Sequence, residues 1–347
     1  MARKTNCSLE TLYNSCMNRE DNLKYEIIRD RVFVTVPDEE LSFDNVNKDD
    51  YAQPTDIKRI LDRDQIKIEY SSDVLEHIRP NNDIYILDDK LSVLNKKAQQ
   101  TGVAIFSKSS DNVKSVTRAW YGEVVANQKS FNWEEFFLDI YDSPCTPSNS
   151  AIIIDRYLFS YETVGEYKST YRDGLRNLKA IFEGLLPEDM NTRYDILVIF
   201  GTGDGVLDNK VTVDDICDKI YEIVEQIERP YEINIELLAI KKQCPLWGPT
   251  HDRRIISNYF LVQAPHGFKA VKSNGEGAFS QLIDAKCIYT GIDSQRQRKK
   301  GLVINYCENT LREIKNSISK LADYDYTCYN IETECLVGSI KNRLLRD

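Results

Sequence analysis

The chain has 347 residues, of which 41% are hydrophobic and 29% are charged, and its formal net charge is −10. This length exceeds one ordinary domain, and this composition excludes a disordered protein. No stretch approaches the roughly 20 apolar residues of a membrane span, and no apolar core of a signal peptide follows the first basic residues. The nine cysteines include no CxxC pair, which argues against a disulfide framework or a zinc ribbon. We therefore expect a cytoplasmic protein with reduced thiols and two domains.

The first part of the chain shows strand and helix patterns in alternation. Strands are expected at residues 32–36, 65–70, 82–89 and 103–110. Helices are expected at residues 55–64, 73–79, 91–101 and 133–141, and Gly102 should end the third of them. This alternation predicts a small parallel sheet. We assign residues 1–141 to an N-terminal α/β domain.

A linker is predicted at residues 142–150, where Pro, Ser and Asn gather, and the second domain follows it. Its strands are expected at residues 151–159, 194–201, 231–240 and 253–264, and its helices at residues 174–186 and 213–227. Thr212 or Asp214 should cap the second of these helices. The pattern predicts an α/β domain with a mixed sheet over residues 151–307. A further helix at 310–321 and a tail make up residues 308–347.

The most informative segment is residues 248–271, which holds two of the three histidines of the chain, His251 and His266. The run His251-Asp252-Arg253-Arg254-Ile255 resembles the HDRxI strand in the phospholipase D-like C-terminal domain of microtubule-interacting-and-trafficking domain proteins. The order of strands and helices from residue 151 to residue 292 is also similar to that domain. The enzymatic HxKxxxxD motif of the phospholipase D superfamily has the same spacing as His251, Arg253 and Asn258.

The resemblance implies how these residues would act. In the superfamily the His attacks phosphorus, the Lys neutralises phosphate charge and the Asp supports the pair. Arg253 can pair bidentately with phosphate, whereas Asn258 cannot supply a carboxylate. We therefore expect a noncatalytic accessory protein in which Asp252, Arg253, Asn258 and His266 bind a ligand. The alternatives are an active phosphodiesterase, either nuclease or phospholipase, with His251 as nucleophile, a membrane-surface module, or a purely structural strand.

The expected partners follow from the same resemblance. They are a phosphate-bearing ligand, a nucleic acid or a protein of a larger complex, by analogy in bacterial antiviral defence or a mobile-element system. A homodimer that brings two His251 side chains together is a further expectation. We predict no cofactor and no metal. Weaker candidates are a phosphate-binding turn at residues 201–205, a basic run at 296–300, a second motif at His77 and Arg79, and the Mg²⁺ ligands Asp155, Asp208, Asp214 and Asp215.

Overall fold

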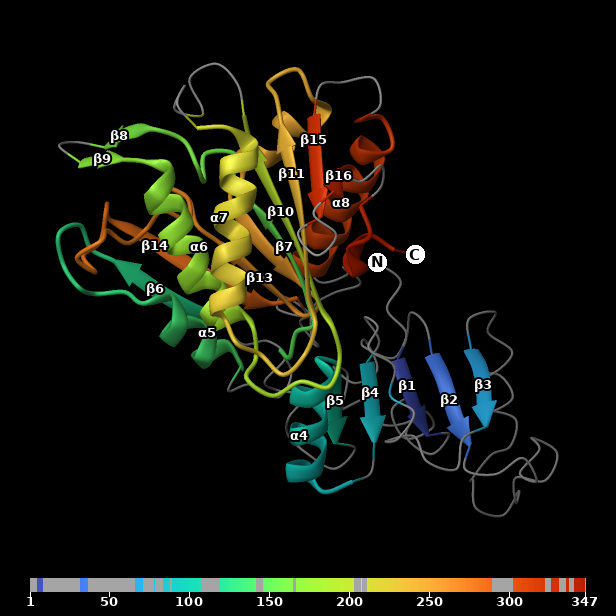
Figure 1. Ribbon diagram of the computed structural model, residues 1–347. Helices are drawn as coiled ribbons and strands as arrows, with labels where there is room; N and C mark the ends of the chain where they lie inside the picture. The colour runs from blue at the N-terminus through green and yellow to red at the C-terminus, as the bar shows by residue number, and fades with distance from the viewer. Residues whose placement is uncertain are drawn as a thin grey trace, which may run out of the picture.

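The computed structural model describes most of the second half of the chain and selected elements of the first (Figure 1). The described residues are 78, 84–87, 89–107, 119–141, 146–164, 167–202, 207, 211–288, 302–321 and 340–346, with the strands at 5–8, 32–36, 66–70, 326–330 and 335–336. They form a five-stranded sheet and a nine-stranded sheet, both combined with helices. A two-stranded hairpin completes them, formed by β8 (Glu162–Val164) and β9 (Tyr167–Ser169). The predicted α/β class, with a small parallel sheet and a mixed sheet, is confirmed.

The small sheet is parallel throughout, with the strand order β3-β2-β1-β4-β5. Its strands are β1 (Thr5–Ser8), β2 (Val32–Val36), β3 (Ile66–Tyr70), β4 (Ile84–Leu87) and β5 (Ala104–Ser107). Four of them coincide with predicted strands, whereas the central strand β1 was not predicted. Helix α4 (Leu91–Thr101) ends as predicted at Gly102, which adopts φ 64°. The helix expected at 55–64 and nearly all of the one at 73–79 lie outside the described residues.

The large sheet has the order β16-β15-β11-β10-β7-β12-β13-β14-β6. At its centre β7 (Ser150–Ile154), β10 (Tyr194–Gly201) and β11 (Ile233–Ile240) are parallel. Parallel neighbours need a crossover connection, which α6 (Tyr171–Leu185) and α7 (Val213–Gln226) supply. These helices lie with α5 (Trp133–Tyr141) on one face of the sheet, and α8 (Leu302–Ile318) lies on the other (Figure 1). All eight residues of β10 are buried, as expected between two covered faces.

Helix α7 shows how sequence fixes an element locally. Thr212 caps it, since its hydroxyl accepts a hydrogen bond from the Asp215 amide while the Asp215 carboxylate accepts one from the Thr212 amide. This reciprocal pair satisfies two amides at the helix start. Thr212 was one of the two predicted caps. The apolar stripe of the helix faces the core, where Ile216 and Ile220 are fully buried.

The remaining strands are antiparallel. The single strand predicted at residues 253–264 is wrong, because Asn258 and Tyr259 form a turn between β12 (Arg254–Ser257) and β13 (Phe260–Gln263). Ser257 and Asn258 are the polar residues between the two apolar runs, and the single predicted strand passed over them. β14 (Gln281–Cys287) and β6 (Ala119–Val124) extend this side, and β15 (Tyr326–Asn330) and β16 (Cys335–Leu336) extend the other.

The predicted boundary at residues 142–150 does not separate the elements as expected. β6 pairs with β14 and α5 packs on α6, so both belong with the large sheet although they precede the expected linker. Thr146 and Ser148–Ser150 are buried rather than exposed. Their polar groups are bonded inside the protein: Asn149 donates to the Thr101 carbonyl and Thr146 donates to the Ile140 carbonyl. A Pro-, Ser- and Asn-rich segment is thus a buried connection whose polar side chains bind nearby backbone.

The end of the chain also docks on the large sheet. Asn342 is fully buried and donates to the carbonyls of Ala151 and Asp195. Arg343 lies 3.3 Å from the buried carboxylate of Asp195, opposite Arg193 at 3.0 Å. These contacts hold the short helix η5 (Arg343–Leu345) at the amino ends of β7 and β10. The tail that the sequence left unassigned therefore completes the core.

Candidate functional site

The candidate site lies at the carboxyl end of β7, where the chain enters a turn at Asp155. Ligand sites of open α/β sheets lie beyond the carboxyl ends of parallel strands. Here the same edge receives the HDR segment, because β12 runs antiparallel to β7 and pairs Arg254 with Ile154. Two short helices, η2 (Pro245–Trp247) and η3 (Pro249–His251), lead into it. We call Asp155, Arg156, Tyr157, Trp247 and Arg253 the edge cluster.

Asp155 forms the buried base of the edge cluster, with 1% of its surface exposed. One carboxylate oxygen accepts a hydrogen bond from the Tyr157 amide at 2.9 Å, and the other accepts from the Phe268 amide at 3.0 Å. The Arg253 Nε atom lies 3.5 Å from the first oxygen. Burial raises the pKa of Asp155, and Arg253 is the strongest influence that opposes this rise. Both of its oxygens accept hydrogen bonds from backbone amides, so Asp155 orients its neighbours.

A tight turn at Gly267 brings the Phe268 amide to Asp155. Gly267 has φ 96°, a conformation that side chains disfavour, and a Cβ atom there would stand 2.8 Å from the Asp155 carboxylate. His266 precedes it with an exposed ring, which contacts Phe279 at 5.8 Å between ring centres. The His266 amide donates to Gln281. His266 therefore lies on the rim of the turn that supports the edge cluster.

Two arginines share one aromatic ring in the edge cluster. The guanidinium carbon of Arg156 lies 4.7 Å from the centre of the Tyr157 ring, and that of Arg253 lies 5.2 Å from it. Arg156 also lies 5.0 Å from the Trp247 ring and donates to the Trp247 carbonyl. Arg253 donates to the Pro265 carbonyl at 2.8 Å. Stacking on rings and bonding to carbonyls fix both guanidinium groups in place without neutralising Arg156.

Arg156 and Arg253 differ in whether a nearby carboxylate neutralises their charge. Arg253 faces the Asp155 carboxylate, whereas Arg156 makes no ion pair with any residue that the structure describes. Arg156 and Tyr157 are both half-buried, so the guanidinium is neither solvated on all sides nor closed off. Within the described part of the chain, the edge cluster thus presents one oriented cation that no carboxylate pairs. Such a group suits a phosphate or carboxylate ligand.

His251 and Asp252 lie beside the edge cluster but are exposed. The His251 imidazole makes no hydrogen bond to the side chain of any described residue, so nothing there orients it as a nucleophile. Asp252 is 67% exposed and lies 3.9 Å from Arg254. Arg254 is buried and donates to Tyr306 and to the Pro249 carbonyl. Of the two consecutive arginines, Arg253 faces the candidate site and Arg254 joins α8 to the turn before β12.

Asn258 does not belong to this site, although the spacing of the motif places it there. It follows the far end of β12, about 16 Å along the strand from Arg253 at 3.3 Å per residue. Its side chain is fully buried, and its oxygen accepts hydrogen bonds from the Asn149 and Ser150 amides at 3.1 and 2.8 Å. Asn258 therefore lies apart from the edge cluster, and its side-chain oxygen is used within the protein. The antiparallel pairing of β7 and β12 separates the ends of the motif.

Lys269 is a buried cation close to Asp155, the base of the edge cluster. Lys269 is 4% exposed, and its ammonium donates to the carbonyl and the hydroxyl of Ser160 at 2.9 and 3.0 Å. It also favours the ionised form of Asp155 electrostatically. Lys269 therefore has a structural role.

The remaining sequence candidates either lie apart from the edge cluster or fall outside the described residues. Among the described residues, no group of His, Cys, Asp and Glu side chains is arranged to hold a metal. Asp214 is exposed and Asp215 is used in the cap of α7. The turn at 203–205, the basic run at 296–300, His77, Arg79 and Asp208 lie outside the described residues. No helix in the described part of the chain is long and apolar enough to cross a membrane.

Sequence reasoning missed Arg156, Tyr157 and Trp247. One signal for the first two was available: they directly follow a buried strand and its terminal Asp155, at the edge where parallel strands place ligand sites. Trp247 had no such signal, because it reaches Arg156 from a segment 91 residues further along the chain.

Comparison with known proteins adds little. No protein family matches the chain, and no curated protein matches it in sequence. A solved structure described as Aa-Ago with externally bound siRNA is 11% identical, with a TM-score of 0.17, over 94% of this chain and 49% of that chain. A structure of Aquifex aeolicus Argonaute is 12% identical, with a TM-score of 0.17, over 90% of this chain and 49% of that chain. The chain thus spans about half the length of both, and similarity at this level supports no argument about function.

Proposed function

We propose that this chain is a noncatalytic, phospholipase D-like binding protein that takes a phosphate-bearing ligand at the edge cluster. The observation that carries the proposal is the Arg156 guanidinium, which is oriented beside Arg253 on the shared ring of Tyr157 and which no described carboxylate pairs. A phosphate group offers several acceptor oxygens and a charge opposite to that of Arg156. Arg156 therefore supplies the main charge contact with the phosphate. Arg253, partly neutralised by Asp155, donates hydrogen bonds that orient the phosphate.

The position of the motif residues supports binding without turnover. A phosphodiesterase of the phospholipase D type needs an oriented His nucleophile, and the His251 ring has no hydrogen-bonding side chain to orient it among the described residues. Asn258 is buried at the opposite end of β12. His251 and Asn258 are therefore too far apart to act together on one phosphodiester group. The active phosphodiesterase, with His251 as nucleophile, is the alternative that the experiment must exclude.

The test measures binding by isothermal titration calorimetry. The probes are inorganic phosphate and a single-stranded oligonucleotide of about ten nucleotides, with and without a 5′ phosphate. Arg156→Ala should weaken binding by about 1.5 to 3 kcal/mol, the range for a hydrogen bond to a charged group, or roughly 10- to 150-fold. Arg253→Ala should weaken it less, because Asp155 already neutralises part of its charge. Equal binding of both oligonucleotides would indicate contacts with the internal phosphates instead of the terminal one.

Arg172→Ala is the matched control, because Arg172 also lies near an aromatic ring, that of Tyr171, but is exposed on α6. It should leave binding unchanged. Turnover of bis-(p-nitrophenyl) phosphate by the wild type, lost in His251→Ala, would replace the binding proposal with the catalytic one. Absence of binding to every probe would refute both.

A further inference from the structure

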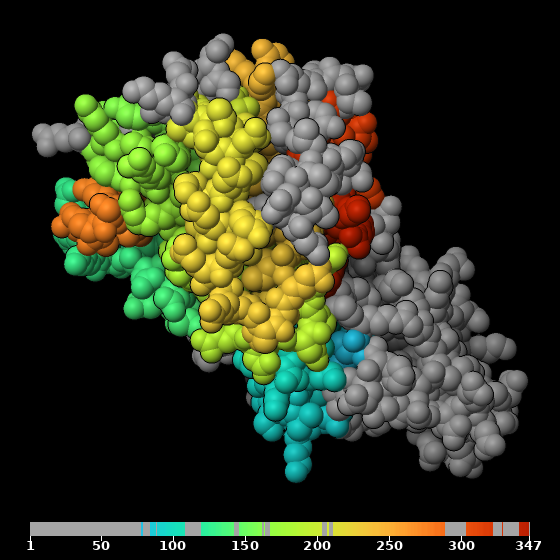
Figure 2. Space-filling model, in the orientation of Figure 1, coloured from blue at the N-terminus to red at the C-terminus, as the bar shows by residue number. Residues whose placement is uncertain are grey.

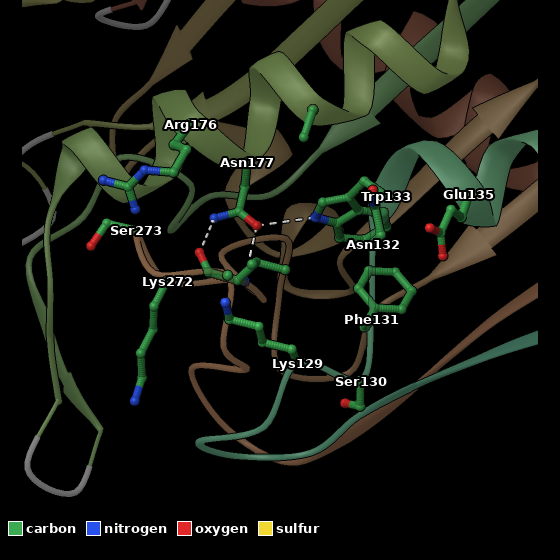
Figure 3. A pocket seen from close by; sticks show the side chains of 13 residues that line it. Lys129, Ser130, Phe131, Asn132, Trp133, Glu135, Arg176, Asn177, Lys272 and Ser273 are labelled. Carbon is green, nitrogen blue, oxygen red and sulfur yellow. Dashed lines mark hydrogen bonds between the residues drawn. The ribbon is translucent and has the colours of Figure 1, made fainter.

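A cavity of about 500 Å³ opens at the surface where three segments meet (Figure 3). Its walls come from the end of the β6–α5 connection, from α6 and from the segment between β13 and β14. Figure 2 shows this last segment, in orange, at the surface beside the green residues of the other two. None of its lining residues belongs to the edge cluster. The volume lies within the usual range of small-molecule sites.

The floor of the cavity is rigid because one buried side chain joins all three segments. The Asn177 oxygen accepts hydrogen bonds from the Trp133 indole and the Val271 amide, both at 3.0 Å. Its amide group donates to the carbonyls of Asp173 and Val271, both at 2.8 Å. Asn177 is 1% exposed, and its oxygen and its amide group are both bonded. The cavity is therefore held open by structure that exists before any ligand arrives.

One wall is aromatic. Phe131 is half-buried and meets Trp133 edge to face, with 4.8 Å between ring centres. Its ring packs over Gly122, where even a Cβ atom would stand 2.3 Å away. Phe131 therefore cannot fold further inward, and it presents apolar surface to the cavity beside Ala180 and Val271.

The facing side is basic, in a chain of net charge −10. Lys129 makes no hydrogen bond or ion pair with any residue that the structure describes. Lys272 has only neutral partners there: it donates to the Asn127 side chain at 2.5 Å and lies 5.1 Å from the centre of the Tyr167 ring. Arg176 is neutralised by Asp173 at 2.8 Å. Glu135 is the acid among the lining residues. In Figure 3 it lies on the far side of Trp133, away from Lys272.

We infer that this cavity is a second binding site, for a small organic anion that carries a flat aromatic ring. The ring would lie against Phe131, and the anionic group would lie between Lys129 and Lys272, neither of which pairs with a described carboxylate. Two sources share this chemistry, a nucleoside monophosphate and an aromatic carboxylate. Both fit the volume, whereas a bare inorganic ion would leave the aromatic wall unused.

The experiment titrates the full chain with adenosine 5′-monophosphate and, separately, with naphthalene-2-carboxylate, and follows binding by calorimetry. Lys129→Glu with Lys272→Glu should weaken binding of the preferred probe at least tenfold, because both attractive charges become repulsive. Lys96→Glu, an exposed lysine on α4, is the matched control and should change nothing. A preference between the two probes identifies the source of the anion.

Two further variants keep the test decisive. Lys129→Ala removes a side chain without described partners, so it should fold normally and still weaken binding even if the double variant does not fold. Arg156→Ala should leave this site unchanged, which separates its failure from that of the edge cluster. The inference is overturned if neither probe binds at millimolar concentration, or if binding is equal in the wild type and Lys129→Ala.

Discussion

The two ends of strand β7 contrast sharply, although both are rich in polar side chains. At its amino end, Asn149, Ser150, Asn258 and Asn342 are fully buried and bond to one another and to nearby backbone. At its carboxyl end, the half-buried Arg156 has no ion-pair partner among the residues with a described position. Buried polar groups must be satisfied within the protein, whereas a binding site needs capacity that the fold leaves unused. The two ends therefore differ in whether their polar groups are satisfied within the protein: those at the amino end are, and the Arg156 guanidinium at the carboxyl end still has capacity for a ligand.

The largest effect should come from the saturated end. Asn258→Leu removes the acceptor for the Asn149 and Ser150 amides and leaves both buried without a partner. At about 1 to 3 kcal/mol for each unsatisfied group, the free energy of unfolding should fall by about 3 kcal/mol in urea denaturation. Gln99→Leu, at an exposed position of α4, should change it by less than about 0.5 kcal/mol. A loss as small for Asn258→Leu would break the contrast.

A smaller effect should come from the turn that supports the edge cluster. Gly267→Ala combines a positive φ with a contact of 2.8 Å to Asp155, so it should cost about 1 to 3 kcal/mol of stability, measured in the same way. Gly275→Ala is matched in φ, at 82°, but its nearest neighbour is the Lys129 side chain at 3.7 Å. It should cost only about 1 kcal/mol. Equal losses would show that the backbone alone, and not the fit against Asp155, requires Gly267.

The pH dependence of stability sharpens the account of Asp155. Burial raises its pKa in the folded state, so the folded protein holds this proton to higher pH than the unfolded chain does. The contribution of Asp155 is thus most favourable below the unfolded pKa and declines as the pH rises through the folded pKa. Asp155→Asn removes this decline, so its stability relative to the wild type should improve as the pH rises from about 4 to 7.

The exposed Asp139→Asn is the control for that series, and its difference from the wild type should show no such trend. If Asp155→Asn instead loses stability relative to the wild type as the pH rises, then Arg253 and the two amides outweigh burial. The pKa of Asp155 would in that case lie below its ordinary value.

The smallest effect should come from His251. Its exposed ring has no hydrogen-bonding side chain among the described residues, so His251→Ala should change the unfolding free energy by less than about 0.5 kcal/mol. Thermal denaturation can check this against Asn258→Leu in one series. A large loss for His251→Ala would give the histidine a structural role.

Local patterns predicted most elements because their causes are local. The stripe of Ile216 and Ile220, the cap at Thr212 and the stop at Gly102 each act within a few residues. Prediction failed where one sequence pattern is compatible with two different structures. The polar run at residues 142–150 has the composition of an exposed linker, yet its partners lie 48 and 109 residues away, at Thr101 and Asn258. The turn at Asn258 has a local signal, the polar pair Ser257 and Asn258 between two apolar runs, but the prediction read this pair as part of one strand.

The sequence by itself determined the α/β class, the helices and the parallel strands at the centre of the large sheet, and the presence of cations next to His251. Only the tertiary structure decided which of these residues meet. The spacing of a motif measures only distance along the chain. Arg253 and Asn258 flank β12, and because a strand is extended they lie at its opposite ends. Pairing of β12 with β7 then brings Arg253 to Arg156, 97 residues earlier in the chain, on the ring of Tyr157.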